Sequence, residues 1–158
     1  MGSNKDAFMA KTLGYMITWT TYGTWLQGDE RGYVKNGLIH PGSKGLMQAN
    51  KQLQLQDAVQ LSKLEQQVVR KAIMKEAVSQ RHHIYVLSVQ PTHVHVVIAY
   101  TPESISTTVA YYKKTGRLAL KCKGYTGKLW TRGYDKRFCF DEESLKHRIR
   151  YVESQNPA

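Results

Sequence analysis

The stretch QPTHVHVVIAY, residues 90–100, decides the fold. Its β-branched residues pack well on a pleated surface and prolines lie near both of its ends, so it predicts a short buried strand. Side chains alternate between the two faces of a strand, which sends His93 and His95 to one side and the valines between and beyond them largely to the other. Two imidazoles on one face can hold one divalent cation.

The spacing of these histidines is also compatible with an incidental pair of hydrogen-bonded side chains. Val97 stands two positions beyond His95, so the His-x-His-x-Asp pattern of many zinc hydrolases is absent. Any metal here takes its other ligands from elsewhere in the chain or from substrate oxygens, which leaves it open to act as a Lewis acid on a phosphate.

The charge of the chain predicts a polyanionic partner. The 158 residues carry 23 Lys and Arg against 12 Asp and Glu, a formal net charge of +11. Residues 111–150 alone hold 12 of the cations and 4 of the acids. Nucleic acid is the leading candidate, and a generally basic surface is the alternative.

The pattern around the histidine strand predicts an α+β domain over residues 1–158 with one core. Further strands are expected over 13–25, 83–89 and 137–140, the second forming a hairpin with the histidine strand through residues 90–92. Amphipathic helices are expected over 58–80, with Asp57 as N-cap, over 102–123, with Ser104 or Ser106 as cap, and over 141–155. Residues 26–56 predict a long loop, either an arm against nucleic acid or a mobile surface segment.

Aromatic residues interleave with cations over residues 128–134, as they do in grooves that bind single strands. Trp130 there is either a stacking platform or a core residue, and Trp19 and Trp25 leave the same choice, with the core favoured. Basic residues also line the helix expected over 102–123. The candidate nucleic-acid-binding residues are Lys113, Lys114, Arg117, Lys121, Lys128, Trp130, Arg132 and Arg148.

The last expected helix has an apolar stripe and a separate polar face. Leu145, Ile149 and Val152 form the stripe at helical spacing, whereas Tyr151 shares the neighbouring face with Gln155, one turn later. A helical tyrosine is normally packing material, and its polar surroundings weaken that interpretation here.

Three pieces of the sequence together resemble one family. They are the Pro-x-His-hydrophobic-His strand at 91–95, the Leu129-Trp130 pair after a Lys-rich helix, and the closing YVESQ at 151–155. Their order and spacing resemble the single-tyrosine HUH transposases of small bacterial insertion sequences, and Asn156-Pro157 is similar to their REP-associated tyrosine transposase relatives. The resemblance implies a ferredoxin-like antiparallel β-sheet with two helices on one face and a C-terminal tyrosine-bearing helix on the other.

The resemblance also implies a site. By analogy, His93 and His95 hold Mg²⁺ or Mn²⁺, Gln155 completes the metal site, and Tyr151 is the catalytic nucleophile. The implied activity is a DNA transposase that nicks and rejoins single-stranded or hairpin DNA through a 5′-phosphotyrosine, acting as a homodimer. Tyr111 and Tyr112 are the alternative nucleophiles if Tyr151 is not used.

Two other functions fit the same residues. One is a domesticated, non-catalytic module that binds single-stranded or hairpin nucleic acid, and the other is a metal phosphodiesterase that uses water. Cys122 and Cys139 lack metal-binding spacing, and the sequence shows neither a signal peptide nor a long apolar segment. We therefore expect a soluble cytoplasmic protein with reduced thiols.

Overall fold

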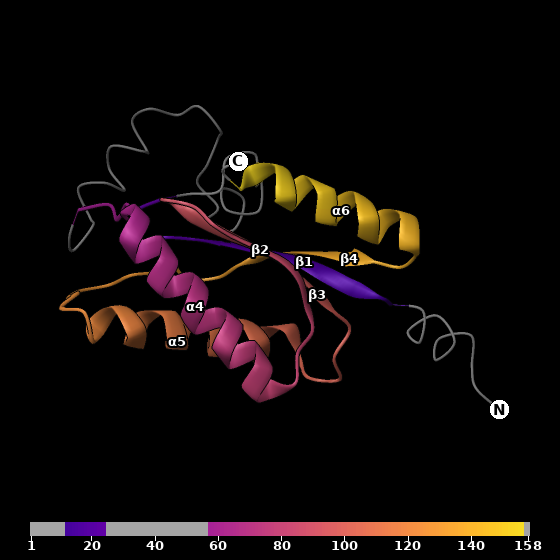
Figure 1. The fold of residues 1–158 in the computed structure, drawn as a ribbon, viewed down its shortest axis with the longest axis horizontal. Helices are drawn as coiled ribbons and strands as arrows, with labels where there is room; N and C mark the ends of the chain where they lie inside the picture. Colours follow the sequence, from indigo (N-terminus) through magenta and orange to yellow (C-terminus); the bar gives the residue numbers. More distant parts are fainter. Residues whose placement is uncertain (1–11, 25–56, 157–158) are drawn as a thin grey trace, which may run out of the picture.

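The computed structural model describes residues 12–24 and 57–156, and in them an antiparallel sheet carries helices on both faces (Figure 1). The strands are β1 (Gly14–Thr20), β2 (Ile84–Val89), β3 (His93–Ala99) and β4 (Asp135–Cys139). The helices are α4 (Lys63–Gln80), α5 (Ile105–Lys121) and α6 (Glu142–Gln155). This confirms the predicted ferredoxin-like α+β arrangement. Trp25 and the loop predicted over 26–56 lie outside the described residues.

The histidine strand lies inside the sheet. The strand order is β2-β3-β1-β4, so β3 pairs with β2 on one side and with β1 on the other, both antiparallel. The predicted hairpin of β2 and β3 is confirmed, and the amide of Gln90 donates to the carbonyl of His93 at 2.8 Å to close its turn.

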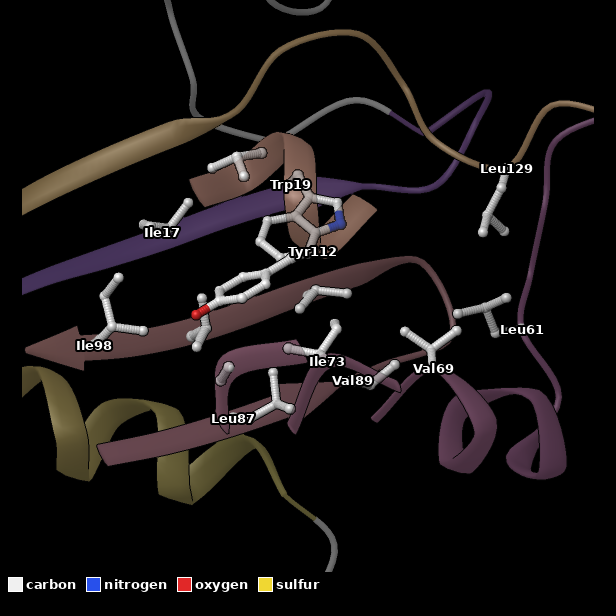
Figure 2. Packing of buried hydrophobic residues seen from close by; sticks show 14 of the residues in the cluster. Ile17, Trp19, Leu61, Val69, Ile73, Leu87, Val89, Ile98, Tyr112 and Leu129 are labelled. Carbon is white, nitrogen blue, oxygen red and sulfur yellow. The ribbon is translucent and has the colours of Figure 1, made fainter. Parts of the chain in front are cut away.

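Each face of the sheet has its own apolar cluster. On the face covered by α4 and α5, Ile17 and Trp19 of β1 pack with Val94 and Val96 of β3 and with Tyr112 of α5 (Figure 2). On the opposite face, a smaller cluster joins the sheet to α6. Its buried members are Met16, Val97, Cys139, Leu145 and Val152. Both sides of β3 are therefore covered, as its apolar run predicts.

The structure settles the choice between core and stacking for Trp19. Its side chain is fully buried, and its ring meets that of Trp130 edge-on at 6.0 Å between centroids. Trp130 is partly buried against the same cluster. Both rings therefore belong to the core on this face of the sheet.

Helix caps differ in one place from the expectation. Ser62, not Asp57, is the N-cap of α4, and it forms a capping box with Glu65. The prediction of Asp57 is wrong because the segment before the helix is extended, and its Val59 amide donates to the carbonyl of Tyr22. Ser104 caps α5, and Asp141 caps α6 as the acidic start of that helix predicts.

Two strand boundaries also shift. β1 ends at Thr20, since Gly23 has a positive φ of 85° and the chain turns there. β4 begins at Asp135, two residues before the predicted start, because Asp135 pairs with Thr18. Within the described part of the chain, no helix is long and apolar enough to span a membrane.

We expect Gly14→Ala to destabilise the fold by about 1–3 kcal/mol. A Cβ at Gly14 would collide with the backbone carbonyl oxygen of Ile98 on the paired strand, which cannot move without breaking the β1–β3 ladder. Urea unfolding followed by circular dichroism measures the loss. A midpoint equal to that of the wild type would show that β1 and β3 separate more easily than their pairing indicates.

Candidate active site

The histidine pair lies on the face of the sheet that α6 covers. His93 and His95 face the same side of β3, as predicted, and their ring centroids are 4.7 Å apart with the planes inclined by 72°. His95 is buried and His93 is half-buried. Neighbouring rings of this kind can present two nitrogens to one small ligand.

Tyr151 of α6 lies next to His95. Its ring centroid is 5.7 Å from that of His95, with an interplanar angle of 73°. The side chain remains 44% exposed, whereas Leu145 and Val152 of the same helix are buried in the apolar cluster. Tyr151 therefore lies beside the predicted apolar stripe, where a substrate in solution can reach it.

A threonine hydroxyl lies within hydrogen-bond distance of Nδ1 of each imidazole. The Oγ1 of Thr18, on the neighbouring strand β1, lies 2.8 Å from Nδ1 of His95. The Oγ1 of Thr92 lies 3.2 Å from Nδ1 of His93. Because Nδ1 of each ring has a hydroxyl partner, Nε2 is the nitrogen suited to bind a ligand.

Burial keeps both imidazoles neutral at neutral pH. Desolvation, with a smaller contribution from His93, lowers the pKa of His95 to about 4, although the charge of Asp135 partly opposes this shift. Desolvation likewise lowers the pKa of His93. A neutral imidazole offers the lone pair that a metal ligand needs.

A buried polar row crosses the sheet at the level of His95, and the sequence analysis missed most of it. Ser88 of β2 and Thr18 of β1 are the register partners of His95, and Asp135 of β4 is the partner of Thr18. All four are buried, although Asp135 also pairs with Arg137 at 3.1 Å. Alternation along residues 15–20 predicts the face on which Thr18 lies. The residues that face it come from distant strands, so no local sequence pattern predicts them.

The last predicted member of the site, Gln155, ends α6. Its backbone carbonyl accepts a hydrogen bond of 2.6 Å from Nε2 of Gln90, three residues before His93. No cluster of three His, Cys, Asp or Glu able to hold a metal occurs among residues 12–24 and 57–156. A cation would therefore rest on two imidazoles, an amide and substrate oxygens, a donor set that fits a catalytic metal with open positions.

The predicted nucleic-acid-binding residues divide between two layers. Lys114, Arg117 and Lys121 are exposed on α5, across the sheet from α6 (Figure 1). Arg148 lies on α6 one turn before Tyr151. Arg132 follows Thr131, whose amide donates to Thr20, the register partner of His93. Arg148 thus lies on the helix that carries Tyr151, and Arg132 lies next to a residue that is hydrogen-bonded to the strand partner of His93.

Three others have partners within the protein. Lys113 is half-buried and its Nζ donates to the carbonyls of Thr131 and Gly133 at 2.9 and 2.8 Å, while burial lowers its pKa to about 8. The indole of Trp130 donates to the carbonyl of Lys113 at 2.9 Å. Lys128 lies over the ring of Tyr22 at 5.5 Å. The hydrogen bonds of Lys113 and Trp130 therefore hold residues 130–134 against α5.

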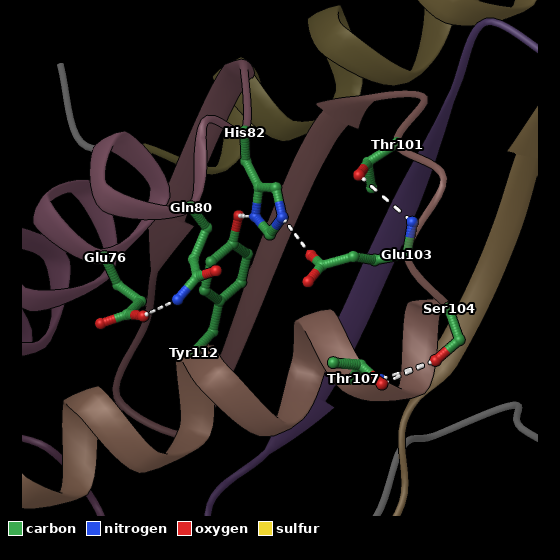
Figure 3. A network of polar contacts seen from close by, with 8 residues as sticks. All are labelled: Glu76, Gln80, His82, Thr101, Glu103, Ser104, Thr107 and Tyr112. Carbon is green, nitrogen blue, oxygen red and sulfur yellow. Dashed lines mark hydrogen bonds and ion pairs between the residues drawn. The ribbon is translucent and has the colours of Figure 1, made fainter.

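The alternative nucleophiles are less accessible than Tyr151. Tyr112 is fully buried, and its hydroxyl is 2.8 Å from Nδ1 of His82, whose Nε2 meets Glu103 at 2.6 Å (Figure 3). Burial, with the charges of Glu103 and Glu76, raises the pKa of Tyr112. Tyr111 packs against the core cluster, partly buried. The Tyr112 network joins α5 to the end of α4 and the start of β2.

Comparison with known proteins identifies the family of this chain. The family model "Transposase IS200 like" matches residues 48–155, well over half of the chain. The protein therefore belongs to the IS200-like transposase family. None of the curated proteins matches it.

Two solved structures are similar to this chain. One is a REP-associated tyrosine transposase bound to a REP hairpin, with 14% identity and a TM-score of 0.53; the match covers 89% of this chain and 64% of that chain. The other is a chain from Deinococcus radiodurans R1 provisionally described as a transposase, with 19% identity, a TM-score of 0.47 and 93% of each chain covered. At these identities the first likeness supports the fold alone.

We expect His95 to make the metal-free protein sensitive to acid. Because its pKa is lowered in the folded state, the unfolded chain takes up the proton first as the pH falls. The free energy of unfolding is unaffected by this group above pH 6.5. As the pH falls toward 4, protonation of His95 in the unfolded chain lowers it progressively, by up to about 3 kcal/mol. Urea unfolding between pH 4 and 7.5 should show a steeper loss for wild type than for His95→Gln.

The matched control is His147→Gln, which changes an exposed histidine of α6. It should keep the wild-type pH dependence. Parallel curves for wild type and His95→Gln would show that burial does not lower the pKa of His95.

Proposed function

We propose that this transposase nicks and rejoins single-stranded DNA with Tyr151 as the nucleophile. The observation that carries the proposal is the contact between the accessible ring of Tyr151 and that of His95, 5.7 Å between centroids, with His93 4.7 Å from His95 on the same face. A nucleophile and a potential metal site are then adjacent within one chain, which supports action in cis. The whole described chain acts as one domain in this proposal.

The reaction is an exchange of phosphate esters. The phenolic oxygen of Tyr151 attacks the scissile phosphorus in line and loses its proton to solvent. The bond from phosphorus to the 3′ oxygen breaks, and that oxygen takes up a proton from solvent. The products are a 5′-phosphotyrosine and a free 3′-OH. Because one ester replaces another, a later attack by a different 3′-OH can release Tyr151 and rejoin strands without ATP.

His93, His95 and Gln155 are the residues that would hold a divalent ion in this mechanism. Such an ion supplies a Lewis acid that draws charge from the phosphate and from the leaving oxygen. The choice is Mg²⁺ or Mn²⁺, and the two nitrogen donors favour Mn²⁺, because Mg²⁺ takes oxygen ligands almost exclusively. Thr18 keeps the His95 ring oriented in either case.

Two basic regions would bind the DNA. Arg148, on the tyrosine helix, and Arg132 would meet the strand that is cut. Lys114, Arg117 and Lys121 form an exposed group on α5 that would meet more distant phosphates, including those of a hairpin stem. Lys113, Lys128 and Trp130 would act on DNA mainly by holding the neighbouring loop. A homodimer remains part of the proposal, since each copy would then bring one DNA end.

We expect Tyr151→Phe to abolish covalent attachment to DNA while leaving folding and DNA affinity unchanged. The assay incubates the protein with Mn²⁺ and single-stranded DNA from the hairpin-forming flanks of its gene, and detects the adduct by denaturing electrophoresis. The control is Tyr100→Phe, which alters another exposed tyrosine, 49% accessible at the far end of β3. It should form the adduct at the wild-type rate.

The products separate this proposal from the alternatives. An equal adduct in Tyr151→Phe would remove Tyr151 from the mechanism. Cleavage with no protein attached would indicate a phosphodiesterase that uses water. Salt-dependent binding with neither product, unaffected by His95→Ala, would indicate a non-catalytic binding module.

We expect the triple variant Lys114→Gln, Arg117→Gln, Lys121→Gln to weaken binding of hairpin DNA and to lower the salt dependence. Each lost phosphate contact removes roughly one unit from the slope of log K against log salt. The control replaces the exposed lysines of α4, Lys63, Lys71 and Lys75, by Gln, with the same change in charge. Equal slopes for the two triple variants in fluorescence anisotropy would show a generally basic surface in place of a binding site.

A further inference from the structure

Gln90 joins the two parts of the candidate site. It follows β2 directly and lies in the turn before β3, where its backbone amide donates to the carbonyl of His93. Its side chain reaches away from the hairpin to α6, which is 65 residues later in the sequence. One residue thus contacts both the strand that carries the histidines and the helix that carries Tyr151.

The amide of Gln90 makes two short hydrogen bonds. Nε2 donates to the backbone carbonyl of Gln155 and to Oγ of Ser88, each at 2.6 Å. The carbonyl of Gln155 belongs to the last turn of α6, where carbonyls have no N–H donor within the helix. Ser88 is fully buried and is the register partner of His95. The bond therefore caps α6 from the turn between β2 and β3, next to buried Ser88.

The C-terminal end of α6 has few other attachments in the described residues. Val152 is its buried side chain, the ring of Tyr151 contacts that of His95, and Asn156 Nδ2 donates to the carbonyl of Leu87 at a long 3.4 Å. No basic residue occupies the last turn. The other end is held by the Asp141 cap and by buried Leu145. Helix ends without a firm partner fray, so the Gln90 bond matters most where Tyr151 and Gln155 lie.

We propose that Gln90 is a positioning residue that fixes the last turn of α6 over the histidine pair. The inference rests on the proposed function, because its value lies in keeping the Tyr151 nucleophile and the Gln155 amide in register with His93 and His95. Gln90 does not touch the reacting atoms. Loss of its bond lets the last turn move, and a displacement of about 1 Å at a reacting group slows a reaction by roughly 100-fold.

The test compares Gln90→Met, of similar length but without a donor, with Gln90→Lys, which can still donate to both oxygens. Gln80→Met is the matched control, because Gln80 bonds to Glu76 at 2.8 Å on α4, in the other helical layer. Three readouts are measured: the adduct rate at saturating DNA and Mn²⁺, the DNA affinity, and hydrogen exchange of amides 152–156.

We expect Gln90→Met to slow the adduct by roughly 10- to 100-fold, with DNA affinity within about twofold of wild type and faster exchange at the end of α6. Gln90→Lys should recover the rate to within about fivefold, and Gln80→Met should match wild type. A Gln90→Met rate within twofold of wild type, or a slow rate without faster exchange, would overturn the role. So would a failure of Gln90→Lys to recover.

Two further outcomes keep the test decisive. If Gln90→Met does not fold, Gln90→Glu replaces it, because a carboxylate has the same shape and repels the Gln155 carbonyl; the same slowing is expected and a wild-type rate overturns the role. If wild type forms no adduct, the proposed function fails, and exchange at 152–156 alone decides whether Gln90 holds α6.

Discussion

The structure depends on the alternation of side chains along β3, a strand that is covered on both faces. Val94 and Val96 face α4 and α5 and help to form the larger core, while His93, His95 and Val97 face α6. A slip of one residue in the pairing with β1 would exchange the two sets, placing imidazoles in the apolar core and valines beneath Tyr151. The same packing that stabilises the sheet therefore fixes the geometry of the site.

The burial that this packing requires also sets the chemistry of the histidines. Removing an imidazole from water disfavours its charged form, and this lowers the pKa of both rings, that of His95 to about 4. The cost of burying polar nitrogens is limited by Thr18 and Thr92, whose hydroxyls meet the Nδ1 atoms. Neutral, oriented imidazoles are what an IS200-like transposase would need to hold a metal.

The sheet separates two kinds of surface. α6 brings Tyr151 and Arg148 to the histidine face, whereas α5 presents Lys114, Arg117 and Lys121 on the opposite layer. The strong positive charge predicted a polyanionic partner but did not indicate that its cations divide in this way. Under the proposed function, a DNA that contacts both groups would have to extend around the edge of the sheet.

The sequence by itself determined the elements that depend on local pattern. The hairpin of β2 and β3, the shared face of His93 and His95, and the apolar stripe of α6 follow from periods of 2 and 3.6 residues. Only the tertiary structure decided which residues complete the site, because Thr18 meets His95 across 77 residues and Gln90 meets Gln155 across 65. The tertiary structure also gives Lys113 and Trp130 hydrogen-bond partners within the protein, although the sequence predicted that both bind nucleic acid. Strand order and helix docking set these contacts, and they depend on how distant segments pack, which no local pattern records.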